Sequence, residues 1–529
     1  MQYLVYDIDY HVIPIQSLGE TPLVQNIGET ERPPYGILAV LMVGAFISFL
    51  NNTLLNIALP SIMFDLKVNT ATVQWLTTGF MLVNGILIPA TAYLIQKYSV
   101  RHLFLASMGL FAIGTILGGT AHIFPLLLAA RMIQASGSAI MMPLLMNVML
   151  VSFPVERRGA AMGVFGLILM FAPAIGPTLS GWIVEHYSWR MLFHFITPIA
   201  VAILVASFFM LKDKKGKVDI QLDFFSLLLS SIGFGGLLYG FSSAGNAGWG
   251  EPQVYITIAV GALSLLWFIL RQIRQEKPML NFRVYKYPMF ALSSAITMIV
   301  NMGLFSGMLL LPIYVQTIRG ISPLDAGLML LPGAIVNAAM SPVNGKIFDK
   351  IGGRALSLAG LFILAVTTFM LSRLTLETGY YYLMGLHAVR MFGMSMVFMP
   401  VSTNGLNQLP PSYYPHGTAM NNTLNQVAAA IGTAVLITVM SMREAAYAAR
   451  MGLSPSSPAQ PFPPEATVAG INDAFLFSAI LIAIAFVLAI FIKRAKPAPE
   501  PGLSGEQRET GSTGGKKVHA EVVISEKRG

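Results

Sequence analysis

The sequence predicts an all-α polytopic membrane protein with 14 transmembrane helices, arranged as two six-helix bundles plus two extra helices. The first observation is composition, since hydrophobic residues make up 55% of the 529 residues and charged residues only 11%. A soluble chain of this length carries about 25% charged residues. The second observation is a series of long apolar segments, and the third is an internal repeat. Together they indicate a duplicated membrane bundle.

The apolar segments are long enough to cross a bilayer. A hydrocarbon core of about 30 Å needs about 20 apolar residues in a helix, and fourteen segments meet this length. An even number of spans predicts that both termini lie on the same side of the membrane. The predicted spans are 37–59, 73–95, 102–121, 124–150, 159–184, 190–211, 223–244, 253–271, 288–317, 324–347, 354–373, 380–406, 416–442 and 472–493.

The internal repeat relates residues 89–104 to residues 342–357. The two segments align at a constant spacing of 253 positions, and each is a short basic turn that closes a hydrophobic hairpin. Such a repeat is typical of transporters that are built from two halves. The second copy carries Asp349 where the first carries Gln96, so one half lacks the acid of the other.

The repeat and the spans together predict the domain organisation. The two extra spans fall between the halves, and the longest loop outside the membrane contains a Pro- and Ser-rich stretch, which favours an irregular structure. The predicted parts are a cytoplasmic N-terminal tail (1–36), an N-terminal six-helix bundle (37–211), a linker with two extra helices (212–287), a C-terminal six-helix bundle (288–493) with an external loop (444–470), and a disordered cytoplasmic tail (494–529).

The distribution of basic residues predicts the orientation. With both termini in the cytoplasm, sixteen of the 33 Lys and Arg fall in short cytoplasmic loops and six fall outside. This excess agrees with the positive-inside rule. We therefore expect a multi-pass protein of the cell membrane, in contact with lipid, with both termini cytoplasmic. The net charge of +9 then reflects orientation, and no nucleic-acid partner is needed.

Several classes of function are excluded by missing residues or motifs. The chain has no cysteine, which rules out disulfides, thiolate metal sites and cysteine nucleophiles. No nucleotide-binding loop, metal constellation or catalytic triad is visible in the sequence, and all loops but one are short. We therefore expect neither an enzyme nor an ATP-driven pump, and no cofactor or metal.

Two intramembrane arginines are the leading candidates for proton coupling or transport. Arg131 lies near the middle of the fourth span with Gln134 on the same helix face, and His387 with Arg390 repeats this pattern in the twelfth span. A buried arginine is costly and usually faces a polar partner or a cavity. For Arg131 the alternative is that it is held by the carbonyl groups of neighbouring helices.

The fifth and thirteenth spans are related by the repeat but differ in character. The fifth is rich in glycine and proline, which predicts a kinked helix that packs closely. The thirteenth carries amides, which either join helices or bind substrate. The residues concerned are Pro173, Gly176, Pro177 and Gly181 in the fifth span, and Asn421, Asn422, Asn425 and Gln426 in the thirteenth.

Apolar and amide side chains predict the lining of a substrate cavity. Methionine adapts to varied apolar shapes, which suits recognition of diverse compounds, although any single methionine is more often ordinary core. The predicted cavity residues are Asn51, Asn52, Trp75, Asn421, Asn425 and Gln426, with the methionines Met141, Met142, Met146, Met391, Met394, Met396 and Met399.

The acidic residues all fall in tails, loops or span ends, so no carboxylate lies near the middle of a span. Proton exchange needs a group that titrates between the pH values of the two faces, and burial moves a carboxyl toward that range. Histidine titrates near neutrality without such a shift. The remaining proton candidates are His194, His387, Asp65, Glu185 and Asp325.

Six motifs in order resemble the major facilitator superfamily, specifically its 14-helix drug:proton antiporter branch and the lincomycin-resistance-type transporters within it. The resemblance covers residues 36–493; each motif alone is modestly specific, and the six in order are a strong indication. They are LNNTLLNIALPSI (50–62), QWLTTGFMLVNGI (74–86), RMIQASG (131–137), APAIGPTLSG (172–181), SWRMLFHFITPI (188–199) and PVNGKIFDKIGGR (342–354).

The resemblance implies roles for individual residues. Arg131 matches the membrane arginine that this superfamily links to proton coupling. The segment 172–181 resembles the antiporter signature, which closes a cavity as the bundles rock. A charge latch at the cytoplasmic face, which stabilises the outward-facing state, is implied for Gly345, Asp349, Arg354 and Arg101.

The chain departs from the family pattern at two places. The 14-helix branch usually carries an aspartate in the first span, where this chain has Asn51, and Gln96 replaces the acid of the first-half loop. With no buried acid to bind a cation, neutral or weakly amphipathic compounds are favoured. The expected function is secondary active multidrug efflux of hydrophobic or amphipathic drugs by alternating access, in exchange for protons. The alternative is a metabolite or osmolyte carrier of the same fold.

Overall fold

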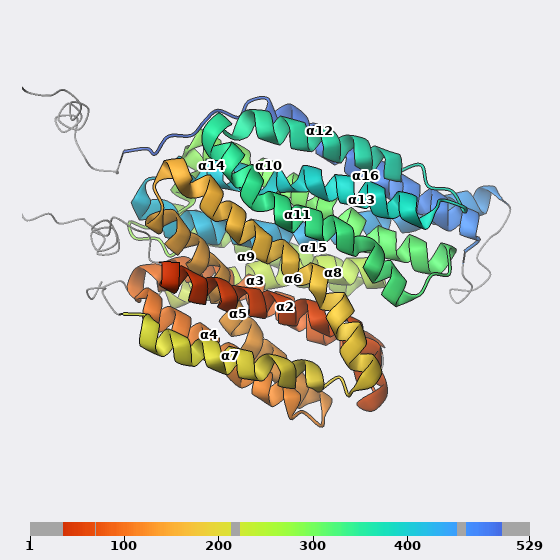
Figure 1. Cartoon of the computed structure of the whole chain (residues 1–529), viewed down its shortest axis with the longest axis horizontal. Coiled ribbons are helices and arrows are strands. Elements are labelled where there is room, and N and C mark those ends of the chain that lie inside the picture. Colours follow the sequence, from red (N-terminus) through yellow and green to blue (C-terminus); the bar gives the residue numbers. More distant parts are fainter. Residues whose placement is uncertain (1–34, 69, 213–222, 452–461, 500–529) are drawn as a thin grey trace, which may run out of the picture.

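Every regular element in the described part of the chain is a helix (Figure 1). The structure is a computed structural model, which describes residues 35–68, 70–212, 223–451 and 462–499. The α-helices are α2 (Tyr35–Asp65), α3 (Thr70–Lys97), α4 (Val100–Gly119), α5 (Phe124–Ser152), α6 (Arg158–His186), α7 (Met191–Met210), α8 (Phe224–Ala247), α9 (Pro252–Arg274), α10 (Pro288–Ile313), α11 (Pro323–Ile351), α12 (Gly353–Leu371), α13 (Tyr380–Ser395), α14 (Phe398–Leu406), α15 (Tyr414–Arg450) and α16 (Pro464–Ala489). Short 3-10 helices are η1 (Val155–Arg157), η2 (Phe282–Lys286) and η4 (Pro411–Tyr413), and η3 (Tyr314–Ile318) is a π-helical continuation of α10.

Within the described ranges, 13 helices are long and apolar enough to cross a membrane. They correspond in order to thirteen of the fourteen predicted spans. The remaining predicted span, 159–184, coincides with α6, which is a helix of 29 residues. The membrane protein and its helical class are therefore confirmed, and the count of 14 stays a prediction.

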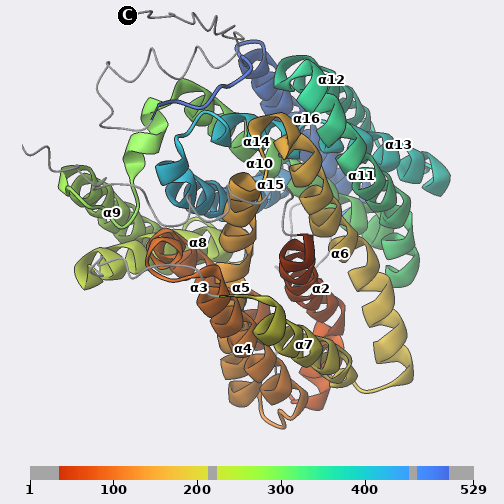
Figure 2. The ribbon, with the colours of Figure 1, turned by 60° about the vertical axis from the view of Figure 1, so that its left-hand side comes forward.

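The helices form two bundles with a helical pair beside them (Figure 2). Helices α2–α7 make the first bundle and α10–α16 the second, while α8 packs against both α3 and α15. Trp75 of α3 stacks on Tyr239 of α8 with ring centroids 5.7 Å apart, and Ala434 of α15 packs in one apolar cluster with Ala244 of α8. Helix α9 lies outside α8 and exposes apolar side chains such as Leu263 and Trp267, which suits contact with lipid.

Asp223 ties the start of α8 to the end of α9. Its carboxylate accepts hydrogen bonds from the backbone of Phe225 and Ser226, each at 3.1 Å, and so caps α8. It also forms an ion pair of 2.9 Å with Arg271. Burial acts to raise the pKa of Asp223, but the hydrogen bonds from Ser226, Gln275 and Arg271 outweigh it and hold the pKa well below its usual range.

The bundles meet closely along α6 and α11. A Cβ atom at Gly345 would lie 2.1 Å from the carbonyl oxygen of Gly159, and one at Gly163 would lie 2.5 Å from that of Ser341. Neither distance leaves room for a side chain. Glycine at these positions therefore allows the two backbones to touch, as in other membrane helix pairs.

The predicted external loop differs from the structure. An irregular loop is predicted for 444–470, yet α15 continues to Arg450 and α16 begins at Pro464; residues 452–461 lie outside the described residues. Helix extensions are favoured there because Arg443 pairs with Asp473, and Thr467 donates a hydrogen bond to Glu444.

The predicted continuous span 380–406 is broken into α13 and α14. Helix α13 ends at Ser395 and α14 begins at Phe398, with tighter backbone hydrogen bonds between them, such as Val397 N–H to the carbonyl of Met394 at 3.1 Å. The break follows a close approach to α12, where a Cβ at Gly393 would lie 2.9 Å from the carbonyl oxygen of Gly360. A broken helix inside a membrane bundle is typical of binding regions in transporters.

Candidate functional site

Asp349 joins the end of α11 to the start of α6. Its two carboxylate oxygens accept hydrogen bonds of 2.8 Å from the backbone N–H groups of Gly159 and Ala160. The first N–H groups of a helix have no partner within the helix, and the positive end of the helix dipole favours an anion there. We call this contact the Asp349 latch, and we call the end of the molecule at which it lies the latch end.

The latch is supported by a residue of the predicted disordered tail. Arg494 follows α16 and donates a hydrogen bond of 2.8 Å to the backbone carbonyl of Asp349, so its charge lies at the carboxyl end of α11, where cations are stabilised. Ala495 donates to Asn404 at 3.2 Å and Ala498 to the carbonyl of Gln408 at 3.0 Å. The prediction of disorder from residue 494 is thus wrong for residues 494–499, because backbone hydrogen bonds hold them on the second bundle.

A neutral contact occupies the position related to the latch by the internal repeat. The Gln96 amide nitrogen of α3 lies 3.3 Å from Nε2 of His416 in α15, and the backbone N–H of Asn281 donates to Nδ1 of the same ring at 3.2 Å. Both bundles are thereby joined on the second side as well. The sequence indicated that this half lacks its acid, and the structure shows which pair stands in its place.

Arg158 is a functional candidate that sequence reasoning missed. It begins α6, beside the Asp349 latch, and its Nη1 donates to the hydroxyl of Tyr414 at 2.9 Å and to the side chain of Asn407 at 3.2 Å. Both acceptors belong to the second bundle, so this arginine also joins the two halves. Its repeat position could have indicated it, because Arg158 and His416 are 258 positions apart, like other matched pairs in these two helices.

The structure does not bring Arg354 and Arg101 to the latch, although the resemblance implied it. Arg354 is exposed, and no hydrogen bond of its side chain is found in the described part of the chain. Arg101 donates to the carbonyl of Phe208 in its own bundle at 3.2 Å and lies 5.2 Å above the ring of that residue. Of the four residues, Gly345 and Asp349 lie at the contact between the bundles.

Arg131 is fully buried within a neutral polar cluster. Its guanidinium donates to Gln134 at 3.0 Å and to the side-chain oxygen of Asn52 in α2 at 3.1 Å. It lies 4.3 Å from the ring centroid of Phe80, and Gln134 in turn donates to Thr115 at 2.8 Å. The predicted Arg131–Gln134 pairing is present, and Asn52, predicted for the cavity, belongs to this cluster.

Arg390 and His387 are both buried. Unlike Arg131 and Gln134, they are not joined by a hydrogen bond in the described part of the chain. Arg390 donates to the carbonyl of Gly303 at 2.6 Å and to the hydroxyl groups of Ser306 and Thr368 at 3.1 Å. Its Nη1, and Nδ1 of His387, have no hydrogen-bond partner within the described residues. The second bundle therefore holds its arginine through α10 and α12, without an amide on the same helix.

The antiporter segment packs mainly within its own bundle. A Cβ at Gly176 would lie 2.3 Å from the hydroxyl of Thr53 in α2, and Ser180 donates to the carbonyl of Leu54 at 2.6 Å. Gly181 has only an ordinary contact with Leu324 of α11, at 3.9 Å from its ideal Cβ. The side chains of Pro173 and Pro177 lie outside the described residues.

The predicted cavity amides differ in their surroundings. Asn421 donates to Ser402 within the second bundle at 2.8 Å, which is a contact between helices. The backbone carbonyl of Asn425 accepts from Asn301 at 2.8 Å, while its side-chain oxygen has no partner in the described part. Asn51 is 3% exposed and its Nδ2 has no partner there either. Gln426 is half-buried in α15.

Trp75 and the methionines predicted for the cavity also lie in different parts of the structure. Trp75 stacks on α8 at 38% exposure and so lies at the contact with the helical pair. Met146 accepts a weak hydrogen bond of 3.7 Å from Asn422 across the bundles. Met399 faces Gly166 of α6, since a Cβ there would lie 2.8 Å from its Cγ. Thus two of the methionines lie where the bundles meet.

Four of the five proton candidates are exposed. His194, Glu185 and Asp325 lie at the surface of their helices, and Asp65 forms an ion pair of 2.8 Å with Arg190. Hydrogen bonds from Arg190 and Trp189 hold the pKa of Asp65 below its usual range. Among the five, His387 alone is buried, so it is the candidate that best fits a role inside the membrane.

Comparisons with known proteins agree with this architecture. The model of the Major Facilitator Superfamily matches residues 41–433. The lincomycin resistance protein LmrB of Bacillus subtilis (strain 168) is 43% identical over 462 residues, which cover 87% of this chain and 96% of the relative. The multidrug export protein EmrB of Escherichia coli (strain K12) is 26% identical over 449 residues, covering 83% of this chain and 86% of the relative.

The fold also resembles a solved structure. The crystal structure of the human organic anion transporter MFSD10 (TETRAN) superposes with a TM-score of 0.62 at 15% sequence identity, covering 87% of this chain and 100% of the other. At this identity the likeness concerns the fold alone. The matched family model, the relatives and the two-bundle architecture lead to one conclusion: this chain is a member of the Major Facilitator Superfamily.

Proposed function

We propose that the chain is a secondary active multidrug exporter, which moves hydrophobic or amphipathic drugs by alternating access in exchange for protons. The observation that carries the proposal is the Asp349 latch, a contact at one end of the bundles that must open if the bundles rock. The names of its relatives, a lincomycin resistance protein and a multidrug export protein, support drug export.

The contacts at the latch end are suited to reversible closure. They are a few polar contacts at helix ends, namely the hydrogen bonds of Asp349 and Arg158 and the Gln96–His416 contact. Each such bond contributes about 1 kcal/mol or, when charged, about 2 kcal/mol. A change in substrate or proton binding of a few kcal/mol is therefore enough to open this end. We propose that the latch end is the cytoplasmic end and that the structure is closed toward the cytoplasm.

Arg131 is proposed as the centre of proton coupling. Its partners are neutral, so its charge is not offset by a carboxylate among the described residues. An uncompensated buried charge responds strongly to any nearby change of charge, because the interior has a low dielectric constant. His387 is the proposed titrating group of the second bundle.

Drug accumulation in a sensitive host tests the function. Cells that express the chain should accumulate less lincomycin, chloramphenicol or ethidium than cells without it, and a protonophore should abolish the difference. Arg131→Ala provides the inactive control at equal membrane abundance. Unchanged accumulation of all three drugs, with growth rescue by import of an osmolyte or metabolite, would instead identify a carrier of the same fold.

Cysteine labelling tests the proposed orientation. Because the chain has no cysteine, single cysteines report one position each. Glu377 and Arg354 are exposed at opposite ends of α12 and its flanking turns. In intact cells a membrane-impermeant maleimide should label Glu377→Cys but not Arg354→Cys. The reverse result would place the latch end outside.

A further inference from the structure

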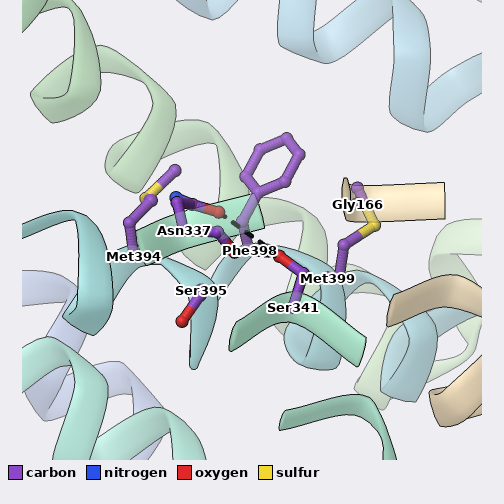
Figure 3. A pocket seen from close by; sticks show the side chains of 7 residues that line it. All are labelled: Gly166, Asn337, Ser341, Met394, Ser395, Phe398 and Met399. Carbon is purple, nitrogen blue, oxygen red and sulfur yellow. Dashed lines mark hydrogen bonds between the residues drawn. The ribbon is translucent and has the colours of Figure 1, made fainter. Parts of the chain in front are cut away.

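The two bundles pack closely beside the break between α13 and α14. A Cβ at Gly166 of α6 would lie 2.8 Å from Cγ of Met399 and 3.3 Å from the hydroxyl of Ser341, and Figure 3 shows these residues close together. A partner that favours this closed state would therefore act from the outer surface of the bundles. At the latch end, the exposed segment that joins α9 to α10 has the charge and the position for such a partner.

Residues 274–286, which we call the basic segment, run from the last residue of α9 to the last residue of η2. They contain four basic residues and one acidic residue, Glu276. All four bases are exposed, and none of them forms an ion pair within the described part of the chain. The bases are Arg274, Lys277, Arg283 and Lys286. The basic segment therefore presents a net positive charge to its surroundings.

The basic segment is anchored by its apolar side. Leu280 and Val284 are fully buried, and Phe282 packs edge-on against Phe268 of α9 with ring centroids 5.9 Å apart. The backbone N–H of Leu280 also donates to the side chain of Gln272 at 3.0 Å. These contacts fix the backbone from which the bases project.

An apolar stripe on α9 leads to the basic segment. Helix α9 lies at the edge of the molecule (Figure 2), and its residues Leu263, Trp267 and Leu270 are 67%, 58% and 47% exposed. Their spacing of four and three residues places them on one face of the helix. Arg274 lies four residues further on and ends the same face. We call these three apolar residues the α9 stripe.

Anionic phospholipids match both parts of this surface. Their acyl chains are apolar like the α9 stripe, and each Lys or Arg near a negatively charged membrane surface strengthens binding about fivefold. In η2, Arg283 and Lys286 are three residues apart, so they share a face of this 3-10 helix. A twofold contact with a second copy of the chain would instead bring two basic segments together, and their charges would repel.

The basic segment also supports the contact between the bundles. The backbone N–H of Asn281 donates to Nδ1 of His416 at 3.2 Å, and Nε2 of that ring faces Gln96 at 3.3 Å. The side chain of Asn281 accepts a hydrogen bond of 3.0 Å from the backbone N–H of Arg283. A headgroup that holds Arg283 in place therefore steadies the residue that orients His416.

We propose that the basic segment and the α9 stripe bind an anionic phospholipid, and that this binding stabilises the closed latch end. The phosphate lies among the exposed bases, and an acyl chain follows the stripe. The link to closure runs through Asn281 and His416. The effect on closure rests on the proposed movement of the bundles, whereas the binding of lipid does not.

Lipid titration of the purified chain in detergent tests binding. Acyl-labelled phosphatidylglycerol should bind more tightly than acyl-labelled phosphatidylcholine, and salt should reduce this preference. Arg283→Gln combined with Lys286→Gln should weaken the binding of phosphatidylglycerol at least about tenfold, because two bases are lost. Lys346→Gln combined with Lys350→Gln removes two exposed bases from α11 at the same end and should keep the wild-type affinity.

Three results would overturn the proposed binding. The first is equal affinity for the two lipids, and the second is the same affinity for phosphatidylglycerol in both double variants. The third is a dimer in detergent that dissociates when Trp267→Ala is introduced, because the α9 stripe would then belong to a contact with a second copy of the chain. Inorganic phosphate, which has no acyl chain, should not displace the labelled lipid.

Cysteine labelling in vesicles tests the effect on closure. In this cysteine-free chain, Ser341→Cys should react with N-ethylmaleimide several-fold more slowly in vesicles that contain phosphatidylglycerol than in vesicles of phosphatidylcholine alone. Arg283→Gln with Lys286→Gln should reduce this difference to less than about twofold, and it controls for the lower pH at an anionic surface. A difference that the double variant retains would refute the link to closure. Neither measurement needs a transported drug, so failure of the proposed export is seen separately.

Discussion

Gln96 and His416 meet at 3.3 Å in the place that the internal repeat relates to the Asp349 latch. One side of the latch end is thus held by a carboxylate on a helix N-terminus and the other by a neutral pair. Since hydrogen bonds to charged groups are roughly twice as strong as neutral ones, the two sides differ in strength. Opening this end breaks the contacts on both sides, so a stronger contact at Gln96 should make opening harder.

Gln96→Glu should strengthen the weaker side and slow export. The backbone N–H of Asn281 donates to Nδ1 of His416, so neutral His416 carries its hydrogen on Nε2 and can donate to a carboxylate. We expect an added stabilisation of about 1–2 kcal/mol and a several-fold lower export rate, measured as drug efflux at equal protein abundance. His416→Asn in the same background should restore the rate. A faster Gln96→Glu variant would contradict the asymmetry.

Asp349→Ala should weaken the closure of the latch end. It removes two charge-assisted hydrogen bonds to the start of α6, which contribute about 2 kcal/mol or more. The ratio of closed to open molecules should fall at least about tenfold, measured as faster maleimide labelling of a cysteine introduced at Ser341. Arg354→Ala is the matched control, because its side chain is exposed and should leave the labelling rate unchanged.

The fold was predictable because it depends on properties that sequence displays directly. Apolar length, the duplicated loop and the ordered motifs indicate two membrane bundles, and the family model confirms the superfamily. The Arg131–Gln134 pair was also predictable, since residues three apart share a helix face. Local spacing is sufficient for such contacts.

The remaining site depends on contacts between distant segments. Nothing local indicates that Arg494 caps α11 or that Asn52 binds Arg131, because each pairing joins helices that are far apart in sequence. The break between α13 and α14 was missed for a related reason. It follows the close approach of Gly393 to α12, and a hydropathy pattern does not report packing distance.

Arg131→Ala should abolish export while leaving insertion intact. The substitution removes the charge at the centre of the cluster and leaves Gln134 and Asn52 without their shared donor. We expect drug efflux to fall to the level of cells without the protein, with equal abundance in the membrane fraction. Arg190→Ala, which breaks an exposed ion pair with Asp65, is the control for loss of a single arginine and should retain most activity. Normal efflux by Arg131→Ala would refute the assigned role.

Asp223→Asn should lower thermal stability equally across the neutral range. The pKa of Asp223 is lowered in the folded state relative to its ordinary value of 3.8. Its contribution is therefore fully present above that value and is lost as the pH falls through the folded pKa. We expect a loss of about 1–2 kcal/mol that is constant from about pH 5 to 8. Thermal unfolding in detergent would measure it. Glu251→Gln, at an exposed residue that makes no side-chain cap bond, should show no loss, and a loss that grows from pH 5 to 8 would contradict the assignment.

Asn51→Asp should shift the substrate profile toward cations. Asn51 is 3% exposed in α2, next to the Arg131 cluster, and its Nδ2 has no hydrogen-bond partner in the described part of the chain. A carboxylate in this low-dielectric region would attract a cationic drug strongly. The ratio of kcat/KM for ethidium to that for chloramphenicol should therefore rise several-fold. Asn51→Leu separates loss of the amide from gain of charge and should leave the ratio unchanged. If both variants kept the wild-type ratio, Asn51 would have no part in substrate selection.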